Sequence, residues 1–214
     1  MIHSSYTALL FGAVALVGFG ASVPKAIAQT TYPFEATYNA EITNKPIAPN
    51  ISESFDVGES VDAPYGLTNI MNMTYAEFDP NTSVFRFDSD PAAIGLEGLP
   101  VGTFTFFGSG SDRLLGRISG SASIDFENLV GTGSSTITIF DGEGRFTDAS
   151  GILELSENAT LSPDPTAPIS SEFRISGSFQ TPEAVPEPKA DATLVAIGLI
   201  GGTFLLRRYR NGTM

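Results

Sequence analysis

Residues 34–42 read FEATYNAEI, and apolar and polar side chains alternate at every step. Phe34, Ala36 and Tyr38 belong to the apolar set, whereas the glutamates, Thr37 and Asn39 belong to the polar set. In a β-strand successive side chains point to opposite faces, so this pattern gives the strand one dry face and one wet face. The stretch therefore predicts a strand whose apolar side covers a core.

The same alternation returns along the chain between residues 31 and 180. It is strong at 173–179 (FRISGSF), and no stretch in this region sustains a helical period for three turns. The pattern predicts an all-β domain, an antiparallel barrel or sandwich of about 8–9 strands. Weaker alternating stretches lie at 51–57, 67–77, 83–88, 103–107, 117–126, 134–140 and 151–161, and expected turns lie at 79–81, 90–91, 108–110, 131–133, 141–142 and 163–165.

The composition excludes several kinds of chemistry. The 214 residues contain no Cys, no Trp and a single His, which is His3. A thiolate nucleophile, a Cys/His zinc site, a disulfide scaffold and a Ser-His-Asp triad therefore all lack a required residue. The formal net charge of −13 also argues against nucleic acid as a partner, because binding to phosphates needs Lys and Arg.

The negative charge is concentrated in the middle of the chain. Residues 29–185 hold six basic and 22 acidic side chains, a net charge of −16. Such acidity keeps a domain soluble and favours cations over anionic surfaces. A solvated acidic surface is the default interpretation.

The N-terminus has the pattern of a secretory signal peptide over residues 1–28. An apolar run at 8–19 precedes Ala26-Ile27-Ala28, an A-x-A cleavage site, so the mature chain is expected to begin at Gln29. The absence of Lys and Arg before the apolar run departs from the usual pattern. The alternative is a buried apolar helix of an intracellular domain.

The C-terminus has the pattern of a membrane anchor. A Pro-rich linker at 182–191 leads into an apolar run at 192–206 and a basic tail at 207–214. A 15-residue helix is about 22 Å long, shorter than the roughly 30 Å hydrocarbon core, so it spans only with local thinning or snorkelling arginines. The positive-inside rule places the tail in the cytoplasm and the all-β domain, 29–181, outside. The basic residues are Arg207, Arg208 and Arg210.

The linker carries Val185-Pro186-Glu187-Pro188. This motif, followed by an apolar helix and an Arg-rich end, resembles the PEP-CTERM sorting signal of exported bacterial proteins. The resemblance implies an exosortase as partner, which processes the chain near the motif, and a destination at the cell surface or in the exopolysaccharide-rich matrix of a biofilm. A plain anchor with a Pro-rich stalk predicts the same topology without cleavage.

Residues 141–151 (DGEGRFTDASG) form a second motif between two expected strands. The glycines can adopt positive φ, and Phe146 can fold back over the end of the sheet as a plug. The stretch resembles the Gly-x-Gly-x-Phe-x-x-Ala-x-Gly loop of allene oxide cyclase-like and dirigent-like barrels, from which it departs at Asp148 and Ser150. The resemblance implies a barrel fold and no activity. The matching residues are Gly142, Gly144, Phe146, Ala149 and Gly151.

Any catalytic or metal-binding role in the exported domain would fall to carboxylates and tyrosines. Asp88 with Asp90, or Asp141 with Glu143, could form an acid–base pair, but such spacing is common in turns. No cofactor is expected; calcium is the ion that turn carboxylates would suit, with capping of the turns as the simpler interpretation. The two candidate calcium sets are Asp79, Asn81, Asp88 and Asp90, and Asp141, Glu143 and Asp148.

The sequence as a whole favours a non-enzymatic, exported cell-surface or matrix protein. The first alternative is a barrel that binds a small ligand or a polysaccharide, at its mouth or on a tyrosine-bearing sheet face. The second is an enzyme of barrel-cyclase or carboxylate-hydrolase type, which would require two carboxylates to converge in an apolar cavity. The tyrosines available for sugar stacking are Tyr32, Tyr38, Tyr65 and Tyr75.

Overall fold

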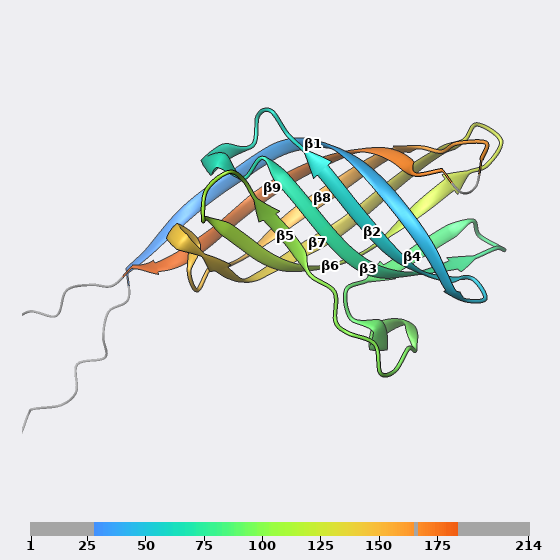
Figure 1. Ribbon diagram of the computed structural model, residues 1–214, viewed down its shortest axis with the longest axis horizontal. Helices are drawn as coiled ribbons and strands as arrows, with labels where there is room; N and C mark the ends of the chain where they lie inside the picture. The colour runs from blue at the N-terminus through green and yellow to red at the C-terminus, as the bar shows by residue number, and fades with distance from the viewer. Residues whose placement is uncertain (1–27, 165–166, 184–214) are drawn as a thin grey trace, which may run out of the picture. The chain divides into compact units, whose positions relative to one another are not determined.

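The computed structural model describes residues 28–164 and 167–183, and the compact unit is Gln29–Glu183 (Figure 1). The described part contains three 3-10 helices and no α-helix, and none of its helices has the length and apolar character needed to cross a bilayer. The strands are β1 (Ala28–Ala48), β2 (Ile51–Glu59), β3 (Asn69–Asp79), β4 (Val84–Asp88), β5 (Phe104–Phe107), β6 (Arg113–Asp125), β7 (Val130–Glu143), β8 (Ser150–Thr160) and β9 (Ile169–Glu183), and the 3-10 helices are η1 (Pro64–Gly66), η2 (Pro91–Ile94) and η3 (Gly144–Phe146).

Most of the predicted signal peptide lies outside the described residues, and so does the C-terminal signal apart from Pro182 and Glu183, which the prediction placed in the linker and which end β9. Of the predicted cleavage residues, Ala26 lies outside, whereas Ala28 and Gln29 belong to β1. The sorting motif from Val185 to Pro188, the apolar run 192–206 and the basic tail with Arg207, Arg208 and Arg210 also lie outside. These interpretations remain predictions from the sequence.

The nine strands form a single sheet that closes on itself. Its order is β2-β1-β9-β8-β7-β6-β4-β3-β5, and the further pairings β2–β3 and β6–β5 join its ends. A closed ring has no free edge strand, which removes the usual route to edge-to-edge aggregation. Of the two architectures expected from the sequence, the barrel is confirmed and the two-sheet sandwich is wrong.

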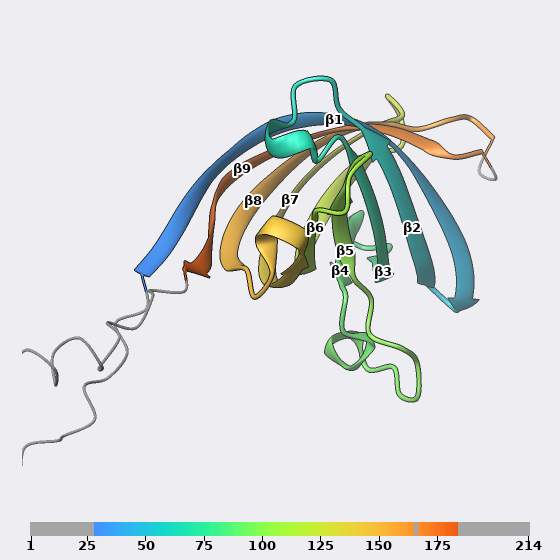
Figure 2. The same ribbon diagram turned by 60° about the vertical axis from the view of Figure 1, so that its left-hand side comes forward.

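Strands β4 and β5 share one position in the ring. Both lie between β3 and β6: residues 75–79 of β3 pair with β4, and residues 69–72 pair with β5. Between them the chain leaves the wall as a loop that contains η2, visible in Figure 2 as the segment that hangs below the sheet. Tyr75 holds this loop, since its hydroxyl donates to the Pro100 carbonyl oxygen at 2.8 Å.

All nine alternating stretches of the sequence coincide with strands, but two expected turns do not exist. Residues 131–133 and 141–142 lie inside β7, and the actual turn between β6 and β7 lies at 126–129. Gly131 of β7 allows close packing, because a Cβ at this position would stand 2.7 Å from Cδ1 of Ile124. A glycine within a strand can therefore mark a crowded interior rather than a turn.

One end of the barrel is filled by aromatic side chains. Phe146 from η3 is fully buried, and its ring meets Phe179 edge-to-face with centroids 5.2 Å apart. Tyr32 stacks on Phe179 at 5.1 Å, and Tyr65 meets both Tyr32 and Phe146 edge-to-face. The prediction that Phe146 plugs the end of the sheet is confirmed.

The loop around Phe146 packs closely against its neighbours because three of its residues are glycines. Gly144 has φ = 67°, and a Cβ on Gly142 would stand 2.2 Å from the Phe146 carbonyl oxygen. A Cβ on Gly151 would stand 2.5 Å from Cα of Phe179, and Ala149 is fully buried. The glycines are thus required by close backbone approach as well as by positive φ.

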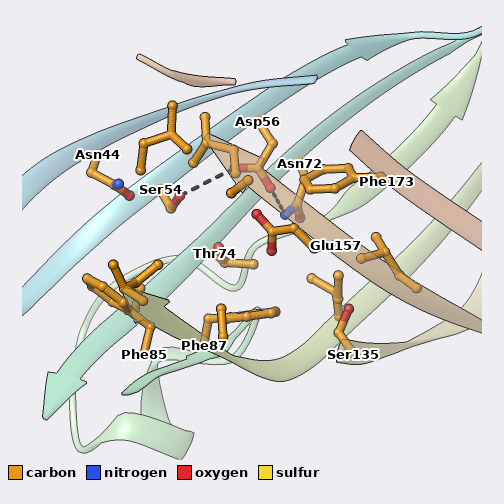
Figure 3. A pocket seen from close by; sticks show the side chains of 18 residues that line it. Asn44, Ser54, Asp56, Asn72, Thr74, Phe85, Phe87, Ser135, Glu157 and Phe173 are labelled. Atoms are coloured by element: carbon orange, nitrogen blue, oxygen red, sulfur yellow. Dashed lines mark hydrogen bonds between the residues drawn. The ribbon is translucent and has the colours of Figure 1, made fainter. Parts of the chain in front are cut away.

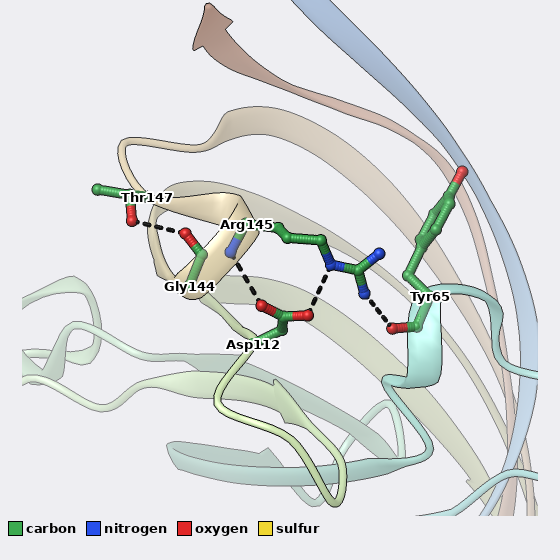
Figure 4. Close-up of polar contacts among 5 residues, drawn as sticks. All are labelled: Tyr65, Asp112, Gly144, Arg145 and Thr147. Atoms are coloured by element: carbon green, nitrogen blue, oxygen red, sulfur yellow. Dashed lines mark hydrogen bonds and ion pairs between the residues drawn. The ribbon is translucent and has the colours of Figure 1, made fainter.

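Arg145 fastens the plug from outside (Figure 4). Its Nε donates to Oδ2 of Asp112 at 2.6 Å and its backbone N–H donates to Oδ1 at 2.9 Å. Its guanidinium also donates to the Tyr65 carbonyl oxygen at 2.8 Å, so that one side chain joins η3, η1 and the start of β6. The bonds to Arg145 hold the pKa of Asp112 below its usual value.

The opposite end of the barrel is surrounded by hairpin turns. The turns β1–β2, β3–β4, β6–β7 and β8–β9 lie there, at the right of Figure 1. Both β1 and β9 meet the rest of the chain at the plugged end, beside Phe179 and Tyr32. The end with these four turns is called the mouth below.

Removal of the plug is expected to destabilise the barrel. Phe146→Ala empties a fully buried aromatic site, which typically costs about 3–5 kcal/mol. Phe55→Ala is the matched control, because Phe55 is 42% exposed on the outer face and its truncation should cost less than about 1 kcal/mol. Urea unfolding followed by circular dichroism measures both, and equal losses would contradict the plug.

Candidate functional site

A cavity of about 90 Å³ lies inside the barrel on the side of the mouth (Figure 3). Partly exposed side chains, among them Ile42, Phe85 and Ile169, line one side of it, so the cavity is reached from solvent. Its apolar wall includes Phe87, Phe173 and Leu155. Its polar residues come from β1, β2, β3, β7 and β8 and are Asn44, Ser54, Asp56, Asn72, Thr74, Ser135 and Glu157.

Asp56 enters the cavity from β2. It is 8% exposed and lies directly opposite Asn72 of β3 in the antiparallel register. The Asn72 Nδ2 donates to Oδ2 of Asp56 at 2.7 Å, and the Ser54 hydroxyl donates to Oδ1 at 3.3 Å. Burial nevertheless dominates and raises the pKa of Asp56 to about 6, against the opposing effect of these two bonds.

Glu157 enters the cavity from β8. The Ser171 hydroxyl is within 3.0 Å of Oε1 and donates to it. Burial raises the pKa of Glu157 to about 7; the bond from Ser171 acts in the opposite direction, and the negative charge of Asp56 raises it further. Both carboxylates line the same cavity (Figure 3).

A glycine makes room for Glu157. Gly133 of β7 is its partner in the register, and a Cβ there would stand 2.9 Å from Oε2 of Glu157. Gly120 of β6 likewise faces Ser135, whose Cβ would be 2.4 Å from an added Cβ. Glycines on two neighbouring strands thus allow close packing beside the cavity, whereas aromatic rings fill the plugged half.

Two buried polar atoms in the cavity have no hydrogen-bond partner within the described residues: Oδ1 of Asn72 and Oγ of Ser135. Asn72 is 2% exposed and Ser135 is 6% exposed. An unpaired buried polar group costs about 1–3 kcal/mol. Such atoms in native proteins are normally satisfied by water or by a ligand.

The carboxylate pairs singled out from the sequence do not form sites. Oδ1 of Asp88 accepts from the backbone N–H of Asp90 at 2.7 Å, and Oδ1 of Asp90 accepts from that of Ala92 at 3.0 Å. Asp141 accepts from the Gly142 N–H, and Glu143 pairs with Arg113 on the surface. These groups cap turns and strand ends, as the simpler interpretation predicted.

The two calcium sets are not assembled either. Asp79 accepts from the backbone N–H of Asn81 at 2.9 Å and from the Thr82 hydroxyl at 2.8 Å, which completes a turn. Throughout residues 28–164 and 167–183, no three His, Cys, Asp or Glu side chains lie close enough together to hold a metal ion. Asp148 has φ = 58°, a turn conformation that Asp tolerates.

The tyrosines do not form an exposed platform for sugar stacking. Tyr38 and Tyr75 are 0% and 1% exposed. Tyr32 and Tyr65 are partly buried and pack against the aromatic plug. The expectation of a tyrosine-bearing sheet face is therefore wrong, and the rings serve the core.

Asp56 and Glu157 did not emerge as candidates from the sequence, although a signal for each exists. In 51–57 the apolar residues Phe55 and Val57 point outward, 42% and 54% exposed, while Ser54 and Asp56 point inward. Glu157 stands on the face that carries Leu153 and Leu155. A strand whose polar side chains face inward, and a carboxylate on an otherwise apolar strand face, both indicate a polar interior.

The comparisons with known proteins give no relative. No family model matches the chain, and no curated protein or solved structure is similar to it at a significant level.

The two buried carboxylates should make the protein more stable at mildly acidic pH. Folding raises the pKa of both carboxylates, so the folded state favours their protonated forms. The free energy of unfolding gained in this way is complete below about pH 4. It is lost as the pH rises through 6 and 7, by up to about 3 kcal/mol for each group. Thermal unfolding between pH 4.5 and 8 measures it. Asp56→Asn and Glu157→Gln should each flatten the profile.

Glu154→Gln is the matched control for this experiment, because Glu154 lies on the same strand as Glu157 but faces solvent. It should keep the slope of the wild type. If Glu154→Gln changed the slope of stability against pH as much as Glu157→Gln does, repulsion between surface charges would explain the pH dependence instead.

Proposed function

We propose that this chain is a non-enzymatic, exported cell-surface barrel that binds a small molecule in its interior. The observation that carries the binding role is the cavity near the mouth, where Asp56 and Glu157 converge within a mainly apolar wall. A partly enclosed, mainly apolar site with a few convergent polar groups is typical of small-molecule binding. A barrel whose other end is plugged suits this role, since it offers the ligand one entrance.

The proposed location rests on the two ends of the sequence. The A-x-A site before Gln29 supports export, and Val185-Pro186-Glu187-Pro188, the apolar run and the arginines support sorting by an exosortase. The membrane is then a transient partner through the C-terminal helix, and the exopolysaccharide of the matrix is the expected surrounding. The strongly acidic barrel would remain soluble in that setting.

An acid–base enzyme is the second candidate, because Asp56 and Glu157 are two carboxylates in a largely apolar cavity. A pKa of about 7 for Glu157 would let it donate or accept a proton near neutral pH. No cofactor-binding motif accompanies the pair in the described residues, and neither His nor Cys lines the cavity. Binding is therefore the simpler proposal, and catalysis would show as turnover of a bound compound that Glu157→Gln abolishes.

Occlusion of the cavity tests the binding role. Ser135→Leu directs a leucine into the cavity, whereas Ser134→Leu places the same side chain on the outer face of β7. A library of small fragments should produce thermal shifts in the wild type and in Ser134→Leu, and those shifts should vanish in Ser135→Leu. Circular dichroism checks that both variants are folded, and a library without any response would contradict the proposal.

Sorting is tested in the native host with the double variant Pro186→Ala, Glu187→Ala. We expect the variant to remain at the membrane with its C-terminal segment attached, because the protease no longer recognises the linker. Mass spectrometry of the mature protein and cell fractionation provide the readout. A variant with the mass and location of the wild type would rule out sorting by this motif.

A further inference from the structure

The carboxylates of Asp56 and Glu157 give the cavity strong hydrogen-bond acceptors, beside the Asn44 amide and the Thr74 and Ser135 hydroxyls, which can donate or accept. Asn72 uses its Nδ2 to donate to Asp56. The Ser54 and Ser171 hydroxyls already donate to Asp56 and Glu157. A ligand that satisfies this site must therefore bring several N–H or O–H donors of its own.

The negative charge of the cavity is not neutralised by the described part of the chain. Asp56 and Glu157 are the only titratable side chains among its lining residues, and no Lys or Arg lines it. Basic side chains of the barrel form ion pairs on the outer surface: Lys45 with Glu53 at 3.5 Å, and Arg174 with Glu172 at 2.9 Å. Two facing carboxylates without a counter-charge favour a cationic ligand.

We propose, on the basis of the ligand-binding role above, that the cavity selects a protonated amine carried on a short apolar group. The ammonium N–H groups donate to Asp56 and Glu157. Such bonds are charge-assisted at both ends, which makes them stronger than bonds between neutral groups.

The apolar lining fits the rest of such a ligand. Phe85, Phe87 and Phe173 present aromatic surface to the cavity, where a ring face also attracts a cation. The volume of about 90 Å³ is smaller than the roughly 150 Å³ of a cavity that encloses benzene, so the enclosed part of the ligand is an ammonium head with a few carbon atoms.

The same cavity disfavours calcium, neutral alcohols and organic anions as ligands. Calcium takes about six to eight oxygen ligands, and in the described residues no three His, Cys, Asp or Glu side chains lie close enough together to hold a metal ion. A neutral alcohol of the same size brings one donor and no charge. An organic anion would meet both carboxylates directly, so it is rejected.

The test compares butylamine with 1-butanol as probes of the full chain at pH 7.5, by titration calorimetry. We expect butylamine to bind and 1-butanol to bind at least tenfold more weakly. Asp56→Asn and Glu157→Gln should each weaken butylamine binding at least tenfold, while Glu154→Gln stays within twofold of the wild type. Both cavity substitutions keep the size of the side chain, and circular dichroism confirms that the variants are folded.

The outcomes separate this inference from the role on which it rests. Equal binding of both probes, lost in Ser135→Leu, would leave a ligand site but overturn the amine preference. Calcium chloride that raises the melting temperature of the wild type but not of Asp56→Asn would make the cavity a metal site and also overturn it. No binding of either probe, together with no fragment response in the occlusion experiment, would overturn both proposals.

Discussion

Closure of the sheet is the constraint on which the rest of the structure depends. Because each position in the ring is paired on both sides, the side chains of one face of every strand must share a single interior. At the plugged end Phe146, Phe179 and their neighbours fill that space with rings. Near the mouth, Ser135, Asp56 and Glu157 line a cavity, so that one barrel contains a packed core and a cavity in series.

The cavity is an exception to the rule that buried charges are paired. Asp56 receives bonds from Asn72 and Ser54, and Glu157 receives one from Ser171, but neither meets a basic side chain in the described residues. A structural role would be served better by apolar residues of similar size, which carry no desolvation cost. Two carboxylates that lower the stability of the fold are expected where an interior serves binding rather than packing.

The sequence predicts the strands of the barrel better than the side chains that line its interior. Alternation locates all nine strands because period two follows directly from strand geometry, and the glycine-rich loop correctly predicts Phe146 as a plug. The interior of β2 could not be predicted in this way, since Phe55 and Val57 are the apolar residues there and yet face solvent. Which face of a strand turns inward depends on the closure of the whole ring, a non-local property.

The candidate site was missed for the same physical reason. Sequence proximity favoured Asp88 with Asp90 and Asp141 with Glu143, but Asp88 and Asp90 accept from backbone N–H groups, and Glu143 of β7 pairs with Arg113. Asp56 and Glu157 are about a hundred residues apart, and only the ring brings β2 and β8 to one interior. Convergent carboxylates in an all-β chain are therefore better sought among polar residues that break the alternation of long strands than among clusters in turns.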